Sequence, residues 1–280
     1  MAVLSLAPPA INGEEAKPPL AVTYVANEGF IIECRDMKVA IDALFGGWKS
    51  DEYYMPTDST IELMKMARPP FDNIDLIAVT HYHSDHFESG IMASHLKHNP
   101  RSTLICPPQV AEKLAKEEGY SEISGRIKTI SAPVDSVVAI KIDEFDIKVL
   151  PGKHGPYFET NEKTGEKIDR HRGVQHLEYL ISMCGRMVFH SGDAPLNDME
   201  RYPRLGLNHV TIDLAMVQWF TPRGIISFRE KLVRETIGAR KIMLMHLPPR
   251  RNFSGPEQKK ICSERNIIIP QRSLENWIIP

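Results

Sequence analysis

Three histidines and an aspartate stand within one run of six residues, His81-Tyr82-His83-Ser84-Asp85-His86. The run directly follows residues 74–80, whose continuous apolar character is typical of a strand buried on both faces. Because side chains two positions apart on an extended backbone point to the same side, the imidazoles of His81 and His83 are expected to converge. Imidazole nitrogen and carboxylate oxygen bind zinc at about 2.0–2.2 Å. The run therefore predicts a metal site at the end of a buried strand, which the rest of the fold must accommodate.

The composition sets limits on the partners of the chain. Of its 280 residues, 42% are hydrophobic and 25% are charged, which is typical of a soluble globular protein with a sizeable core. Its 34 Lys and Arg against 36 Asp and Glu give a net charge of -2, so it lacks the basic excess of most nucleic-acid binders. No stretch approaches the roughly 20 apolar residues of a transmembrane helix. A small-molecule substrate is therefore expected rather than nucleic acid, and a homo-oligomer is left open.

The cysteines and the amino-terminal segment bear on the compartment. Cys34, Cys106, Cys184 and Cys262 are widely spaced and form no CxxC pair, so neither a disulfide framework nor a cysteine zinc site is expected. Free thiols favour a reducing compartment such as the cytoplasm. Residues 1–20 have no basic residue before their short apolar run, which makes them a poor signal peptide and predicts a flexible leader. The same leader also suits the mature form of an exported protein, so the compartment stays undecided.

Residues 21–280 are predicted to form a single domain in which strands and helices follow one another in blocks. The expected strands cover 21–25, 29–34, 37–42, 74–80, 102–106, 126–130, 136–142, 145–151, 176–183, 186–190, 209–217 and 241–246. The expected helices start at Thr57 or Asp58 and end by Pro69, and cover 88–97, 108–119 and 226–238. Residues 159–172 are polar without a hydrophobic face and predict an exposed loop, inside an insertion near 157–173. This order fits a layered αββα sandwich of the α/β (α+β) class with one core between two sheets.

The sequence resembles the metallo-β-lactamase superfamily, whose signature is the HxHxDH pattern seen here at His81–His86. Other landmarks of that superfamily follow in order: Asp42 in KVAID, His154 in LPGKHG, Asp193 in FHSGDAP and His246 in MLMH. Together they span about residue 21 to residue 248, which is nearly the whole chain. The resemblance implies the four-layer αββα sandwich of the superfamily. It does not select one reaction within it.

The resemblance also implies a pair of metal ions about 3.5–4 Å apart. The implied ligands are His81, His83 and His154 for the first metal, Asp85, His86 and His246 for the second, and Asp193 as a bridge. The expected cofactors are two Zn²⁺, or another divalent ion such as Mn²⁺ or Fe²⁺. Zinc lowers the pKa of bound water towards about 7, which provides a hydroxide nucleophile at neutral pH. Asp85 is the expected catalytic residue, since it can also shuttle a proton to the leaving group.

The third histidine of the first metal site is open between two positions. Both His154 and His176 follow the central strands and precede Asp193, so their order permits either. His154 ends a strand in a glycine-flanked loop, where functional side chains tend to be presented. His176 opens a strand whose alternate residues should fill the core, so a structural or pocket-lining role is expected. His154 is therefore the preferred ligand.

The remaining polar and aromatic candidates have structural interpretations. Asp42 is expected to accept the N–H of a ligand imidazole, with an ordinary turn aspartate as the alternative. The other histidines are expected to be structural (His190), solvent-facing (His95 and His98) or without a ligand pattern (His171 and His209). Trp219 and Phe220 are expected in the core, with a substrate-pocket wall as the alternative.

The motif layout most resembles the branch that contains ascorbate-6-phosphate lactonase and the phospholipase D acting on N-acyl-phosphatidylethanolamine. It shares the early third histidine with an insertion after it, the HSGDA stretch and the MLMHLPP ending. A zinc-dependent hydrolase of a small-molecule ester, lactone or phosphodiester is therefore expected. The alternative is an RNA-processing nuclease like ribonuclease Z, which shares HxHxDH, although the net charge disfavours an electrostatic grip on phosphates. Iron-carrying members usually have a carboxylate at the second-site histidine and an added flavin domain, and neither is evident.

Overall fold

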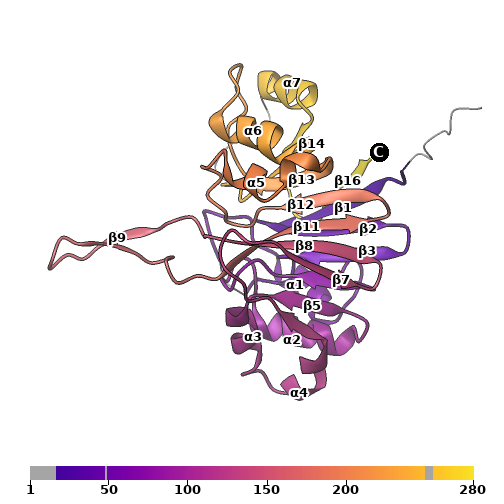
Figure 1. The fold of residues 1–280 in the computed structure, drawn as a ribbon. Coiled ribbons are helices and arrows are strands. Elements are labelled where there is room, and N and C mark those ends of the chain that lie inside the picture. The colour runs from indigo at the N-terminus through magenta and orange to yellow at the C-terminus, as the bar shows by residue number, and fades with distance from the viewer. Residues whose placement is uncertain (1–16, 48, 250–254) are drawn as a thin grey trace, which may run out of the picture.

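The computed structural model describes residues 17–47, 49–249 and 255–280. Two seven-stranded sheets pack face to face, and helices cover the outer face of each sheet (Figure 1). The αββα sandwich predicted from the sequence is thereby confirmed. Most of the leader predicted at 1–20 lies outside the described residues, because the description begins at 17 and the first strand at Leu20. None of the helices in the described ranges is long and apolar enough to cross a bilayer.

The first sheet comes mainly from the first half of the chain. Its strands, in spatial order, are β16 (Glu275–Ile279), β1 (Leu20–Ala26), β2 (Gly29–Cys34), β3 (Met37–Ile41), β4 (Leu76–Ala78), β5 (Thr103–Cys106) and β6 (Ile127–Thr129). The strands from β3 to β6 run parallel, whereas the pairs β16–β1, β1–β2 and β2–β3 are antiparallel. The helices of this half are α1 (Asp58–Lys65), α2 (Ser89–His98), α3 (Pro108–Leu114) and α4 (Tyr120–Ile123), with a 3-10 turn at Ser124–Arg126.

The second sheet comes from the second half. Its strands, in spatial order, are β15 (Ile267–Ile268), β14 (Ala239–Met245), β13 (Ile212–Gln218), β12 (Arg186–His190), β11 (His176–Met183), β8 (Phe145–Gly152) and β7 (Val138–Ile142). The helices of this half are α5 (Arg201–Arg204), α6 (Phe228–Leu232) and α7 (Pro256–Glu264), with a 3-10 turn at Leu207–His209 and a π-helical turn at Val233–Ile237. Because β8, β12, β13 and β14 share one direction, their carboxyl ends meet at one edge of the sandwich.

A period of two in the strand sequences accounts for the core between the sheets. In β8, Phe145, Ile147 and Val149 are buried, whereas Asp146 and Lys148 between them are exposed. Alternate side chains of a strand point to opposite faces, so the first three pack against the other sheet. Burying one large apolar side chain contributes roughly 1.5–3 kcal/mol, so this core holds the strand ends in place.

Two predicted helices are each divided into two shorter elements, and a glycine with a positive φ lies at a boundary of each. Thr57, one of the two residues expected to start the first helix, caps α1 by accepting the N–H of Thr60. The helix predicted at 108–119 ends at Leu114, and Gly119, with a φ of +75°, separates it from α4. The helix predicted at 226–238 is α6 followed by the π-helical turn, which Gly238 ends with a φ of +74°.

The polar stretch at 159–172, predicted as a loop, contains most of a β-hairpin, which is a correction. Its strands β9 (Phe158–Thr160) and β10 (Lys167–Asp169) pair from Lys167↔Thr160 to Asp169↔Phe158. The side chain of Asn161 closes the turn by accepting the N–H groups of Lys163 and Thr164. The hairpin projects away from the sandwich (Figure 1). Because both its faces meet solvent, it needs no hydrophobic side, and the sequence pattern therefore concealed it.

Candidate metal centre

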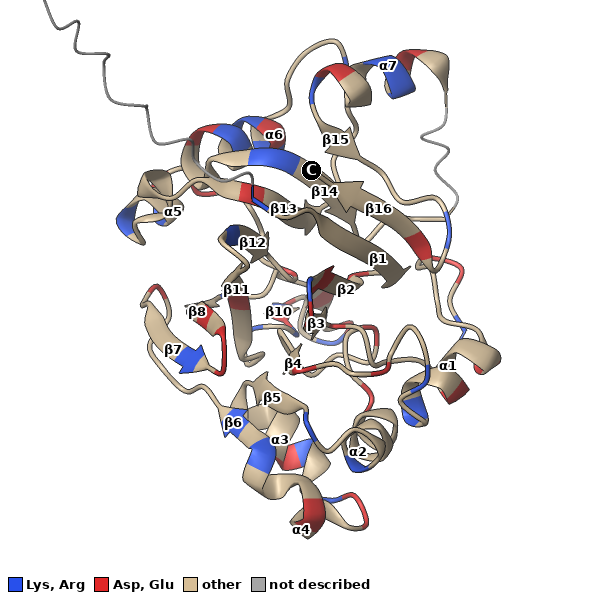
Figure 2. Cartoon of the chain, turned by 90° about the vertical axis from the view of Figure 1, so that its right-hand side faces the viewer, with Lys and Arg blue, Asp and Glu red and all other residues tan. Residues whose placement is uncertain are grey.

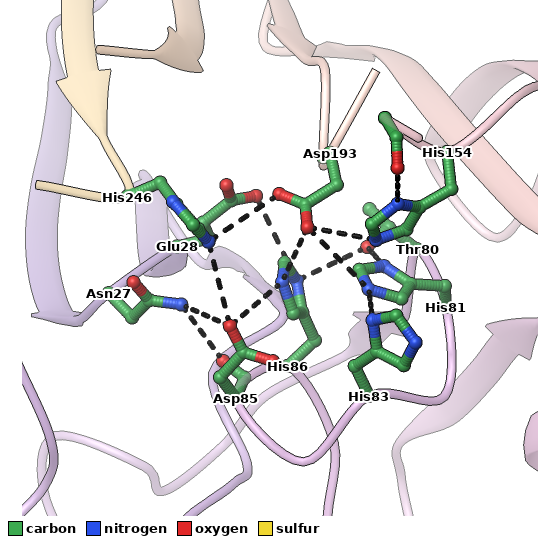
Figure 3. A network of polar contacts seen from close by, with 12 residues as sticks. Asn27, Glu28, Thr80, His81, His83, Asp85, His86, His154, Asp193 and His246 are labelled. Carbon is green, nitrogen blue, oxygen red and sulfur yellow. Dashed lines mark hydrogen bonds and ion pairs between the residues drawn. The ribbon is translucent and has the colours of Figure 1, made fainter. Parts of the chain in front are cut away.

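The seven predicted ligands lie together at the edge of the sandwich where the strands of both sheets end. His81, His83, Asp85 and His86 follow β4, whereas His154 follows β8, Asp193 follows β12 and His246 follows β14. Each of these residues lies in the loop that follows a strand. The packed core holds the end of the strand in place, and the side chain in the loop points towards the centre. Both halves of the chain therefore contribute to one centre (Figure 3).

The first cluster contains His81, His83, His154 and Asp193, whose ligand atoms all lie within 4.8 Å of one another. Nε2 of His81 lies 3.0 Å from Nδ1 of His83, and Nε2 of His154 lies 2.9 Å from Oδ2 of Asp193. Burial, followed by the neighbouring His154, lowers the pKa of His83 to about 4. His83 is therefore neutral at pH 7, as a metal-binding imidazole must be.

The second cluster contains Glu28, His86, Asp193 and His246, again within 4.8 Å of one another. Oδ2 of Asp85 lies beside it, 3.6 Å from Nε2 of His86 and 3.6 Å from Nε2 of His246. Asp193 belongs to both clusters: its Oδ2 lies 3.8 Å from Nε2 of His86, and its Oδ1 lies 3.8 Å from Nε2 of His246. Figure 3 shows Asp193 between the two groups of side chains, which is the place of a shared ligand.

A buried nitrogen of His86 shows whether these residues fit a metal. Its Nε2 is buried and has no hydrogen-bond partner among the described residues. A buried polar atom without a partner is costly in free energy, and a metal ion is a partner that relieves the cost. Imidazole suits zinc, iron, copper and nickel, and carboxylate suits manganese and magnesium, so the mixed donor set fits a divalent metal.

Asp42 orients His86 from behind. Its Oδ2 accepts the Nδ1–H of His86 at 2.8 Å and the hydroxyl of Thr80 at 2.6 Å, as its expected role required. With the proton on Nδ1, the lone pair of Nε2 faces Asp85 and Asp193. Burial lowers the pKa of His86, but the carboxylates of Asp85 and Asp42 outweigh burial and raise it to about 9, so a metal that binds Nε2 near neutral pH must displace a proton from it.

The two candidates for the third histidine differ in what they contact. His154 is part of the first cluster, whereas no cluster found among the described residues includes His176. His176 is buried, and a Cβ atom on Gly192 would stand 2.6 Å from its Nε2 and 2.9 Å from Cβ of Thr80. Gly192 also has a φ of +47°, which glycine adopts readily. His176 therefore packs under the turn that carries Asp193.

Separate alanine substitutions at these two positions are expected to have different effects. His154→Ala should lose metal from the first cluster, because one imidazole donor disappears. His176→Ala should keep both equivalents of metal and lower the thermal midpoint, because it leaves a cavity beneath Gly192. Bound metal and melting curves measured on both variants check this. The opposite pattern, with metal lost only from His176→Ala, would make His176 the ligand.

Histidines outside the centre correct one expectation. His95 was expected to face solvent, but it is buried, and its Nδ1 donates to the carbonyl of Met64 at 2.7 Å. It lies on the face of α2 that packs against α1, and its partner is a carbonyl near the end of that helix, which also accepts the N–H of Ala67 at 3.2 Å. His98 and His209 are exposed. His190 is structural, because its Nε2 donates to the carbonyl of Glu28 at 2.9 Å.

A cavity of about 440 Å³ opens on the centre. Its lining residues include Asp85 and His83 as well as Tyr53, Tyr157 and His171. The ring of His171 lies 4.2 Å from that of His154 and 4.8 Å from that of His83, centroid to centroid. The base of the β9–β10 hairpin brings His171 to this place, so the sequence around it shows no ligand pattern.

Trp219 and Phe220 pack in the outer core of the second sheet, as expected.

Two residues in the β1–β2 turn also belong to the centre and were missed from the sequence. Nδ2 of Asn27 donates to Oδ2 of Asp85 at 3.0 Å, and the carbonyl of Asn27 accepts the N–H of His246 at 3.0 Å. Glu28 is completely buried and stands in the second cluster. Polar residues in a hairpin turn usually face solvent, so only the position of this turn beside the centre could have indicated them.

The sequence and the fold of the chain are similar to those of known proteins. The sequence profile described as "Beta-lactamase superfamily domain" matches residues 38–247. Among curated proteins, none matches the sequence. The metallo hydrolase Igni18 from Ignicoccus hospitalis has a similar structure, with a TM-score of 0.58 and 16% identity over 94% of this chain and 99% of that chain.

Two further solved structures are similar. The metallo-beta-lactamase fold protein YhfI from Bacillus subtilis has a TM-score of 0.58 and 16% identity, over 94% of this chain and all of that chain (100%). Human tRNase Z, short form, has a TM-score of 0.57 and 12% identity, over 93% of this chain and 99% of that chain. At such identities the likeness shows the fold and not the activity.

Proposed function

The chain belongs to the beta-lactamase superfamily, and from this premise we propose that it is a hydrolase with a dinuclear divalent metal centre. One observation carries the proposal: Asp193 belongs to both clusters of ligand atoms, with His154 at 2.9 Å on one side and His246 at 3.8 Å on the other. A carboxylate so placed is able to join two metal sites. The proposed ligands are those expected from the sequence: His81, His83, His154, Asp85, His86, Asp193 and His246. Zinc is the proposed metal.

Bound divalent metal supplies a water nucleophile at neutral pH and polarises the oxygen of the group under attack. The residues of the chain do the rest. Asp85 lines the cavity and is held by Asn27 at 3.0 Å, so its carboxylate is positioned to accept and pass on a proton. Gln218 donates to Oδ1 of Asp193 at 2.7 Å, which fixes the shared carboxylate.

The proposed substrate is a small molecule with an ester, lactone or phosphodiester bond. The cavity of about 440 Å³ over the centre is within the roughly 300–1,000 Å³ range of small-molecule sites. A second cavity of about 760 Å³ adjoins it through His154, Pro156 and His171. Its charged lining is mixed, with Lys153, Arg172 and Arg201 beside Asp135, Asp169 and Asp198. An anionic group on the substrate is therefore proposed from the motif layout, which resembles that of the lactonase branch, and not from the charge of this cavity.

An RNA-processing nuclease is the second candidate, because the fold resembles that of human tRNase Z, short form. The charge distribution favours the small molecule. Figure 2 shows Lys and Arg beside Asp and Glu along α3, α6 and α7, so that basic segments alternate with acidic ones. A phosphate backbone is usually bound along a continuous basic surface, because several phosphates must be neutralised together.

Metal removal followed by reloading tests the proposed function. Protein stripped with a chelator is expected to lose hydrolysis of its best substrate from a panel of lactones, phosphodiesters and thioesters. Two equivalents of Zn²⁺ per chain should restore it, whereas the same Zn²⁺ without protein should not. Hydrolysis that persists in metal-free protein would contradict the proposal. Cleavage of a structured precursor RNA, with no turnover of the small molecules, would favour the nuclease.

A further inference from the structure

The turn between β1 and β2 carries a carboxyl group into the interior of the candidate centre. Glu28 has an exposed fraction of 0%, and neither of its side-chain oxygens has a hydrogen-bond partner among the described residues. Buried carboxyl groups are normally paired with a donor or a cation, because an uncompensated one is very costly. In Figure 3, Glu28 lies next to His246 and Asp193. The side chain therefore faces the centre, where its polar neighbours are the ligand candidates His86, Asp193 and His246.

The backbone of the turn is held so that Glu28 cannot swing out to solvent. The carbonyl of Glu28 accepts the Nε2–H of His190 at 2.9 Å, and the carbonyl of Asn27 accepts the N–H of His246 at 3.0 Å. A Cβ atom on Gly29 would meet the carbonyl of Asp42 at 2.8 Å, so the turn also packs closely on the end of β3. Three neighbouring segments thus fix the place of the Glu28 side chain.

The surroundings of Glu28 are rich in negative groups. Its Oε2 lies 3.8 Å from Nδ1 of His86, but that nitrogen already donates to Asp42 at 2.8 Å. Its side chain is within 4.8 Å of ligand atoms of Asp193 and His246, and the carboxylate of Asp85 lies 3.6 Å from His246. Like charges brought together in a buried site repel strongly unless a cation stands among them or one carboxyl is protonated, and burial, followed by the charge of Asp193, raises the pKa of Glu28.

We propose that Glu28 is a further ligand of the second metal, so that this metal has more carboxylate donors than the first. The proposal rests on the dinuclear centre proposed above and adds a residue to it. The second metal would then have the carboxylates Glu28, Asp85 and Asp193 with the imidazoles of His86 and His246. The first would have three imidazoles and one carboxylate, which is a set typical of zinc.

The difference in donors implies a difference in metal preference between the two positions. Carboxylate oxygen suits Mn²⁺ better than imidazole does, whereas a site with three imidazoles favours Zn²⁺. With Glu28 as a ligand, the second position should accept Mn²⁺ more readily than the first. A chain loaded with one equivalent of Zn²⁺ and then with Mn²⁺ should bind the manganese at the second position.

The test is Mn²⁺ binding to zinc-preloaded protein, followed by electron paramagnetic resonance of free and bound Mn²⁺. Wild type is expected to bind one equivalent of Mn²⁺. Glu28→Gln is expected to bind it at least about tenfold more weakly, the lower end of what even an indirect metal partner contributes. Glu33→Gln is the matched control, since Glu33 lies on β2, the strand that follows the turn, with its side chain 42% exposed, and should match wild type.

The choice of glutamine separates the two roles that Glu28 can have. A neutral carboxyl hydrogen-bonded to Asp193 would be well replaced by the amide, so equal Mn²⁺ affinity of Glu28→Gln and wild type would overturn the proposal. Wild type that binds no second metal at all would overturn the dinuclear centre and the role of Glu28 together. Melting curves of stripped protein check folding. If Glu28→Gln does not fold, Glu28→Asp replaces it, and affinity unchanged in Glu28→Asp would likewise overturn the proposal.

Discussion

Asp85→Asn is expected to lower kcat by at least about a hundredfold, the low end of what a positioned acid–base group contributes. Burial raises the pKa of Asp85, but the charge of His86 and the hydrogen bond from His246 outweigh burial and lower it to about 2. The side chain is therefore an ionised carboxylate near neutral pH, able to hold a metal and to accept a proton. The amide is neutral, is a poorer ligand and takes up no proton, so both contributions are lost at once.

Steady-state kinetics on a verified substrate measure this, with bound metal determined in parallel. Asp146→Asn is the matched control, because Asp146 is an exposed aspartate on β8, far along the strand from the centre, and should keep wild-type kcat. A kcat for Asp85→Asn within roughly threefold of wild type would contradict the assigned role, since that is far below the contribution of a positioned acid–base group.

The double variant His81→Ala, His83→Ala is expected to fall from about two metal equivalents per chain to about one or fewer, with loss of activity. These two imidazoles are half of the first cluster, and their ring nitrogens lie 3.0 Å apart. Removing both leaves His154 and Asp193, which are too few donors for a four-coordinate metal. Elemental analysis of purified protein gives the stoichiometry directly.

The control for this variant is His95→Ala. His95 is a buried histidine bonded to the carbonyl of Met64, outside both clusters, so its removal should cost stability and leave the metal content unchanged. A double variant that retains two full equivalents would exclude the first cluster as a metal site. Metal loss from His95→Ala alone would mean that metal content merely follows the stability of the fold.

The layered fold could be predicted because its determinants are local. The period of two in β8 and the apolar run before His81 are read within a few residues, and each matches an observed strand. The clustering of His81, His154, Asp193 and His246 came from the order of superfamily landmarks, not from periodicity. The sequence alone does not show that the ends of β4, β8, β12 and β14 meet at one edge. That meeting is a property of the strand order.

The residues that were missed depend on contacts between distant parts of the chain. Glu28 looks like a solvent-facing turn residue until β1 and β2 are placed beside β14. His171 lies in a polar stretch, and only the β9–β10 hairpin returns it to His154. The strand β16 was not predicted either, because its side chains alternate between partly buried and exposed and its partner β1 is some 250 residues away in the sequence.

The division of the centre between the two sheets has a consequence for unfolding. His81, His83, Asp85 and His86 come from the half of the chain that forms the first sheet, and His154, Asp193 and His246 from the half that forms the second. An ion held by both sets has its full coordination only while the two halves stay together. By linkage, ions at 100 times their dissociation constant add about 2.7 kcal/mol per site to the free energy of unfolding. Metal supply in the cell would then control how long the protein survives proteolysis, in addition to how fast it works.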